Sequence, residues 1–72
     1  MLKLTSLRVA RRWSRAELAR RARMAAGDVG KIEAERLQPY DSQLRKLARA
    51  LGIPADAAPT LLTTTVPPDE AA

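Results

Sequence analysis

Residues 14–35 read SRAELARRARMAAGDVGKIEAE, and this stretch decides the fold of the chain. Ser14 followed three residues later by Glu17 is a capping-box pattern, which predicts that a helix begins here. Two sets of apolar residues follow at helical spacing, and Met24 lies at a turn between them. The first set is Leu18, Ala19 and Ala22, and the second is Val29 and Ile32. The stretch therefore predicts two short helices joined by a tight turn.

Apolar spacing on either side of this pair predicts three more helices. We expect a helix over residues 3–12, a helix that begins after Pro39 with Tyr40 or Asp41 as its cap and ends at Gly52, and a weak helix over residues 55–62. The second helix of the pair is expected over residues 26–33. The tail TTTVPPDEAA is polar and interrupted by prolines, so we expect it to be disordered. The sequence thus predicts an all-α protein, with a compact five-helix bundle over residues 1–62 and a disordered tail over residues 63–72.

The composition excludes several classes of function. The chain has 72 residues and contains no Cys and no His, which excludes disulfides, structural zinc and catalysis by Cys or His. Its acids are scattered without the spacing of a nucleophile–base pair or of metal ligands, so we expect no enzyme, no cofactor and no metal. No apolar run approaches the roughly 20 residues of a membrane span, and no signal peptide is visible. We therefore expect a cytoplasmic protein that does not bind membranes.

Positive charge is concentrated in the first two thirds of the chain. All 13 Lys and Arg lie within residues 1–52, which hold five acids and therefore carry a net charge of +8. Seven arginines but only one acid, Glu17, lie between Arg8 and Arg23. Such a field attracts a phosphate backbone, an anionic membrane or an acidic protein. The alternative interpretation is a solvated arginine-rich surface.

The chain contains a series of motifs that recur together in one known family. They are Leu7-Arg8, Ser14-x-x-Glu17-Leu18-Ala19, Val29-x-x-Ile32-Glu33, Pro39 and Leu44-x-x-Leu47-Ala48-x-Ala50-Leu51-Gly52. In this order and spacing they resemble the helix-turn-helix domain of phage repressor and Cro proteins, known as the XRE family. The resemblance runs without gaps over residues 4–53. Within the two helices of residues 14–35, the small side chain of Ala19 allows a steep crossing. The second of these helices then protrudes and can enter a DNA major groove about 12 Å wide.

The resemblance implies a lambda repressor-like fold that binds operator DNA, usually as a dimer. It also implies a largely buried ion pair between Arg8 and Glu33, which joins the first helix to the end of the third. By position, it places DNA contacts at Ser14, Arg15, Ala26, Gly27, Asp28 and Lys31. The arginines around this face are further candidates for phosphate contacts, namely Arg12, Arg20, Arg23 and Arg36, with Arg15 again among them.

The third helix departs from the family pattern, because its outward face offers few side chains that read bases. Lys31 can bind guanine O6 and N7, Asp28 can accept from cytosine N4, and Ala26 can touch a thymine methyl group. The rest of that face is smooth, being formed by Gly27, Gly30 and Ala34. Arg23 also holds the turn position where the family usually has Gly, so it must adopt a left-handed or bridging conformation or reshape the turn.

These observations leave two function hypotheses of different classes. The first is a sequence-specific DNA-binding transcription regulator, for example a repressor, which is nucleoid-associated when bound. The second is a helix-turn-helix fold reused to bind a protein partner through the smooth face of the third helix. RNA binding is poorly supported, because Trp13 and Tyr40 are the only aromatic residues and we expect Trp13 in the core.

Two leucines near the end of the fold bear on the oligomeric state. Leu61 and Leu62 follow the last strongly predicted helix, and they indicate an apolar surface that must be buried against another part of a protein. We therefore expect a homodimer through the fifth helix and the end of the fourth, which would place DNA half-sites about 34 Å apart. The alternative is that both leucines fold back on the first and fourth helices of their own chain.

Overall fold

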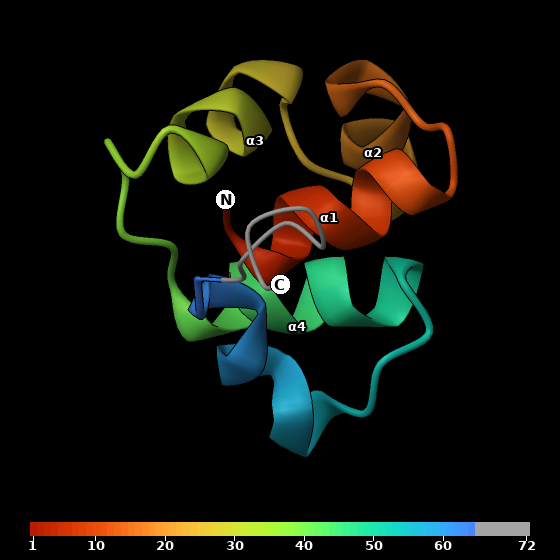
Figure 1. The fold of residues 1–72 in the computed structure, drawn as a ribbon. Coiled ribbons are helices and arrows are strands. Elements are labelled where there is room, and N and C mark those ends of the chain that lie inside the picture. Colours follow the sequence, from red (N-terminus) through yellow and green to blue (C-terminus); the bar gives the residue numbers. More distant parts are fainter. Residues whose placement is uncertain (65–72) are drawn as a thin grey trace, which may run out of the picture.

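The structure, a computed structural model, describes residues 1–64. These residues form four α-helices and one 3-10 helix, as shown in Figure 1: α1 (Lys3–Ala10), α2 (Arg15–Ala22), α3 (Ala26–Glu33), α4 (Asp41–Ala50) and η1 (Ala55–Leu62). The predicted all-α, five-helix architecture is confirmed. The predicted disorder of the tail falls on residues 65–72, which lie outside the described residues.

All five elements contribute to one apolar core. Its largest fully buried side chains are Leu4, Leu18, Val29, Ile32, Leu47, Leu51 and Leu61. α2 packs against α3, and Ala19 of α2, the small residue expected at their crossing, is buried at 2% exposed. Because α4 packs against both α2 and η1, it ties the helical pair to the rest of the bundle.

The two ends of the described chain pair with each other. The backbone N–H of Lys3 donates to the carbonyl oxygen of Thr63 at 2.8 Å, and Leu2 and Thr64 form an isolated antiparallel bridge. Thr63 and Thr64 were expected to belong to the disordered tail, but these contacts make them part of the folded unit. Backbone pairing, which a polar composition does not reveal, thus holds the end of η1 on the start of α1.

The helix starts follow the predicted capping residues with one difference. Ser14 caps α2, where its Oγ accepts a hydrogen bond from the Glu17 N–H at 3.0 Å. The carboxylate of Glu17, however, accepts from Arg20 Nε at 2.8 Å, so the reciprocal half of the predicted capping box is replaced by an ion pair. Tyr40 caps α4, and its N–H donates to Gln43 Oε1 at 2.8 Å.

Residues in the left-handed conformation end the helices. Arg12, Arg23 and Glu35 have φ values of 59°, 58° and 60°, and Gly52 has a φ of 73°. The prediction that the first helix continues to Arg12 is therefore wrong, because its left-handed backbone turns the chain out of the helix after Ala10. Of the outcomes left open for Arg23, the structure shows the left-handed conformation.

The weak fifth helix has the predicted bounds but a tighter winding. Pro59 lies inside it and has no N–H to donate, which disfavours a regular α-helix. Leu61 is 0% exposed and η1 packs on α4 and α1, so the expectation that Leu61 forms apolar surface is wrong. For this leucine the alternative, folding back on its own chain, is correct, whereas Leu62 stays only partly buried at the rim of the core.

Candidate nucleic-acid interface

The carboxylate of Glu33, at the end of α3, ties that helix to α1 and α2. It accepts from Arg8 through Nε at 2.7 Å and through Nη2 at 3.1 Å, and from Arg15 Nε at 3.1 Å. The Glu33 side chain is only 2% exposed and that of Arg8 is 13% exposed. The structure thus brings Arg8 and Glu33 together in the buried pair that the resemblance implies, and it adds Arg15 as a third member.

Arg8 and Arg15 differ in how many of their guanidinium nitrogens remain available to a ligand. Arg8 also donates from Nη1 to the carbonyl oxygen of Trp13 at 2.7 Å, so each of its three nitrogens is bound within the fold. The Arg15 side chain is 59% exposed, and its only hydrogen bond in the described part of the chain uses Nε. Its two terminal nitrogens can therefore bind an anion while Nε holds Glu33.

Ser14 and Arg15 lie together at the start of α2, where both have groups that can donate to an anion. The Ser14 hydroxyl accepts from the Glu17 N–H and keeps its own proton to donate. The N-terminus of a helix favours negative charge, because its first N–H groups lack intrahelical partners. A Cβ placed on Gly30 would lie 3.8 Å from Arg15 Cδ, so this end of α2 directly borders α3.

The outward face of α3 is smooth, with a single cation. Val29 and Ile32 are buried, as the helical spacing predicts, while Ala26, Gly27 and Lys31 are exposed. Asp28 lies at the flank and is partly buried. Lys31 forms no ion pair with any residue between 1 and 64, so its ammonium group is available to a partner.

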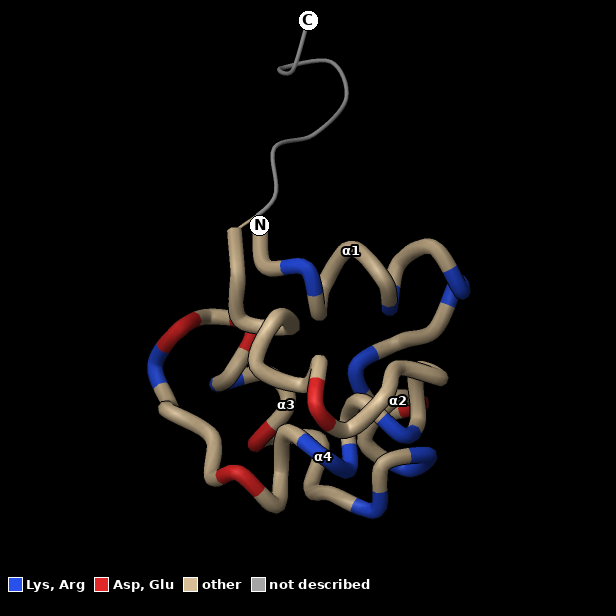
Figure 2. Tube along the Cα trace, turned by 90° about the horizontal axis from the view of Figure 1, so that it is seen from below, with Lys and Arg blue, Asp and Glu red and all other residues tan. Residues whose placement is uncertain are grey.

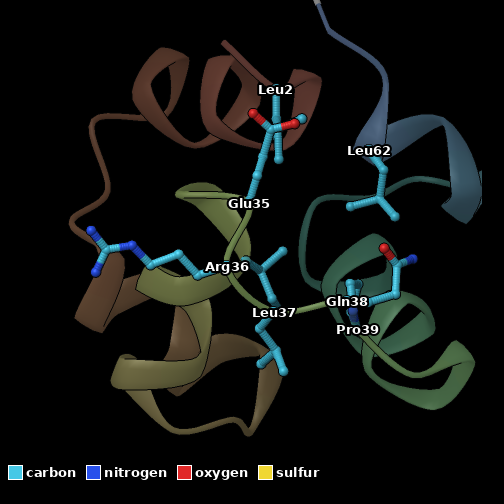
Figure 3. Close-up of a pocket in the computed structure, with 8 residues that line it drawn as sticks. Leu2, Glu35, Arg36, Leu37, Gln38, Pro39 and Leu62 are labelled. Carbon is cyan, nitrogen blue, oxygen red and sulfur yellow. The ribbon is translucent and has the colours of Figure 1, made fainter.

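Arg36 extends this face just beyond the C-terminal end of α3. Its backbone N–H donates to the carbonyl oxygen of Lys31 at 2.8 Å, which fixes the loop after α3 close to that lysine. Figure 3 shows the Arg36 side chain directed away from Leu2 and Leu62. Two exposed cations therefore lie beside the C-terminal half of α3, namely Arg15, which bonds Glu33, and Arg36, which follows the helix.

The remaining predicted phosphate ligands lie elsewhere. Arg12 is exposed in the turn between α1 and α2. Arg20 is engaged by Glu17, with 2.6 Å between Nη2 and Oε2. Arg23 lies at the far end of α2 from Ser14, beside the end of α4. The predicted site residues thus form one compact face around α3 and a more distant set of arginines.

Several arginine contacts were missed from the sequence. Arg11 Nη2 donates to the Leu51 carbonyl oxygen at 2.6 Å, which closes the end of α4. The Arg21 guanidinium lies 4.4 Å from the centroid of the Trp13 ring, which packs against the core as expected. Arg11 and Leu51 are 40 residues apart, so no local pattern reveals their contact.

A family model described as a helix-turn-helix domain matches residues 2–61, which include every helix but the last residue of η1. The chain belongs to this helix-turn-helix domain family. The family is of the XRE/Cro-like type of DNA-binding domains, as the sequence motifs indicate. No curated protein and no solved structure matches the chain.

Neither a cluster of metal ligands nor a membrane-spanning helix is found in the described part of the helix-turn-helix domain. No group of three acids, the only potential metal-ligating residues here, comes together within residues 1–64. None of the helices in that range is long and apolar enough to cross a membrane. The α2–α3 pair, which is the helix-turn-helix unit of the family, is therefore the candidate nucleic-acid interface.

The glycines of the helix-turn-helix domain give a pair of predictions with opposite signs. Gly30→Ala is expected to raise the free energy of unfolding by about 1 kcal/mol, since Ala favours a helix interior and its Cβ makes only an ordinary contact at 3.8 Å. Gly52→Ala is expected to lower it by about 1 kcal/mol, because φ is 73° there. Thermal unfolding followed by circular dichroism measures both, and a lower melting temperature for Gly30→Ala would contradict the expectation.

Proposed function

We propose that this helix-turn-helix domain is a sequence-specific transcription regulator that binds operator DNA through α3 and the start of α2. The observation that carries the proposal is the exposed face of α3, where Lys31 has no ion-pair partner among the described residues and the cationic groups of Arg15 and Arg36 lie beside the C-terminal half of the helix. With α3 in a major groove about 12 Å wide, those two arginines meet the phosphates that border it. Ser14 donates to a phosphate beside Arg15.

Within this arrangement the bases are read by few side chains. Lys31 binds guanine O6 and N7, the flanking Asp28 accepts from cytosine N4, and Ala26 touches a thymine methyl group. Gly27 lets the helix approach the bases closely, since nothing in the fold lies within 4 Å of a Cβ placed there. Arg12, Arg20 and Arg23 add phosphate contacts farther from α3. Affinity then comes mainly from phosphates, and sequence preference from one or two contacts.

We further propose that the regulator binds as a homodimer in the cytoplasm, associated with the nucleoid. Each good bidentate base contact favours the correct base pair by about 1–3 kcal/mol. Because one copy makes few such contacts, a dimer doubles their number and so raises the sequence preference. Leu62 supports an interface at η1, because it stays partly buried and lines an open hollow of about 450 Å³ between the paired chain ends and the loop after α3 (Figure 3). Sedimentation is expected to show a dimer at high micromolar concentration, and a monomer there would contradict this interface.

Footprinting on the DNA upstream of its own gene tests the proposed regulator. We expect two protected half-sites about 34 Å apart. Lys31→Ala is expected to relax the preference at one base pair in each half-site by about 1–3 kcal/mol while leaving the phosphate contacts in place. Absence of protection at low salt, or an unchanged base preference in Lys31→Ala, would overturn the proposal.

A second candidate function is a protein-binding module that uses the same face of α3. It is favoured by the smoothness of that face, where Gly27, Gly30 and Ala34 would let the helix of a partner approach closely. Gly30→Leu separates the two candidates. A partner that copurifies in stoichiometric amount with the wild-type chain and is lost from Gly30→Leu supports the protein-binding module, and retention of that partner in Gly30→Leu counts against it.

A further inference from the structure

A second basic surface lies away from the α3 face. An open groove of about 510 Å³ runs between the C-terminal ends of α2 and α4. Its lining consists of Arg21, Ala22 and Arg23 from one side and Lys46, Arg49 and Ala50 from the other. Figure 2 shows the Lys and Arg positions gathered around α2 and α4. Four cations therefore face this groove, and no acid lines it.

The charge of the groove is poorly compensated within the fold. Arg23, Lys46 and Arg49 are exposed and form no ion pair within residues 1–64, and Arg21 approaches Glu17 only to 3.6 Å. Arg45 on the same helix differs, since its Nε lies 2.9 Å from Asp41 Oδ2. Like charges held close together repel one another, so an anion that enters the groove removes an unfavourable interaction as well as adding favourable ones.

The lining of the groove restricts which polyanion fits. Besides the four cations it contains Ala22, which is 3% exposed, and Ala50, and we call these two residues its alanine floor. A chain with apolar as well as anionic groups matches this lining, whereas a DNA duplex presents a charged phosphate surface and offers little to the alanines. Single-stranded nucleic acid binds through stacking on aromatic rings, and none lines the groove, since the nearby Trp13 ring is covered by Arg21.

We propose that this groove binds an acidic peptide segment of a partner protein. The carboxylates of the segment pair with Arg21 and Arg23 on one wall and with Lys46 and Arg49 on the other, while its apolar groups lie on the alanine floor. No residue of α3 lines the groove, and it lies at the opposite end of α2 from Ser14. Arg23 is the one groove residue that is also proposed to contact a phosphate. The other three cations take no part in the proposed DNA contacts, so the peptide and an α3 ligand can bind at the same time.

Fluorescence anisotropy with a labelled peptide of alternating Glu and Ala tests the proposal at low salt. The double variant Lys46→Gln/Arg49→Gln is expected to weaken peptide binding by about threefold to tenfold, the range for two partly exposed ion pairs. The matched control Lys3→Gln/Arg45→Gln removes the same charge outside the groove and is expected to leave binding within about twofold. Circular dichroism checks that both proteins are folded, as expected for exposed or half-buried side chains.

A second arm of the experiment uses duplex DNA in place of the peptide. Equal peptide binding by the two double variants, or no peptide binding by the wild-type chain, would overturn the proposal. A different result would also show that the proposal is wrong. In it, the groove variant binds the peptide normally, but the slope of its log DNA affinity against log salt concentration is shallower by about 1.8. That change corresponds to two lost phosphate contacts, so the groove would bind DNA phosphates. Unchanged DNA binding together with weakened peptide binding is the result that supports it.

Discussion

Replacing Glu33 by alanine is expected to lower the free energy of unfolding by about 3–5 kcal/mol. The substitution leaves the Arg8 guanidinium, whose side chain is only 13% exposed, without the carboxylate that it binds through two nitrogens. It also releases Arg15, so α3 loses its links to both α1 and α2 at once. Urea unfolding of the two proteins measures the difference.

Two further variants identify the cause of this loss. Asp41→Ala removes a carboxylate from the exposed pair with Arg45 and is expected to cost no more than about 1 kcal/mol. The double variant Arg8→Met/Glu33→Leu removes both buried charges and is expected to recover much of the stability, because no unpaired charge remains. If Glu33→Ala costs no more than Asp41→Ala, the network does not hold α3 in place.

Reversing the charge at Lys31 is expected to weaken binding to duplex DNA by about 100-fold or more. The change removes the one base contact of about 1–3 kcal/mol that a lysine on this face supplies. It also adds a carboxylate next to Asp28 on a face that meets phosphates, and like charges across an interface cost several kcal/mol. Lys31 is exposed and has no ion-pair partner in the described chain, so Lys31→Glu leaves the fold intact.

The matched control for this change is Lys3→Glu. It alters the net charge by the same amount at the start of α1, far along the chain from the helix-turn-helix unit, and there an acid is compatible with the helix dipole. We expect DNA binding to fall only a few-fold, through the long-range field. Equal losses for Lys3→Glu and Lys31→Glu in a mobility-shift titration would show that net charge, and not the α3 face, governs binding.

Local patterns predicted most of the fold. The Ser14 cap and the apolar spacing of Val29 and Ile32 placed α2 and α3, whereas for Arg23 the left-handed conformation was one of several outcomes left open. The end of α1 was missed, because a left-handed Arg12 depends on the path of the chain toward Trp13 and not on helix propensity. The burial of Leu61 likewise depends on packing between distant segments.

The candidate site was only partly accessible from sequence. The resemblance indicated the Arg8–Glu33 pair, but the additional bond from Arg15 to Glu33 arises because α2 crosses α3 at close range. The basic groove was missed for a similar reason. Its cations come from two helices about 25 residues apart, and only the folded chain brings Arg23 and Lys46 to one surface.

The salt dependence of affinity for duplex DNA tests the central claim, that the α2–α3 face binds the DNA backbone. We expect log affinity to fall linearly with log salt, with a slope of about 0.9 for each phosphate bound. Arg15→Gln/Arg36→Gln removes the two proposed phosphate contacts beside α3 and is expected to make the slope shallower by about 1.8, whereas Lys3→Gln/Arg45→Gln leaves it unchanged. No binding at low salt, or the same slope in all three proteins, would contradict the claim.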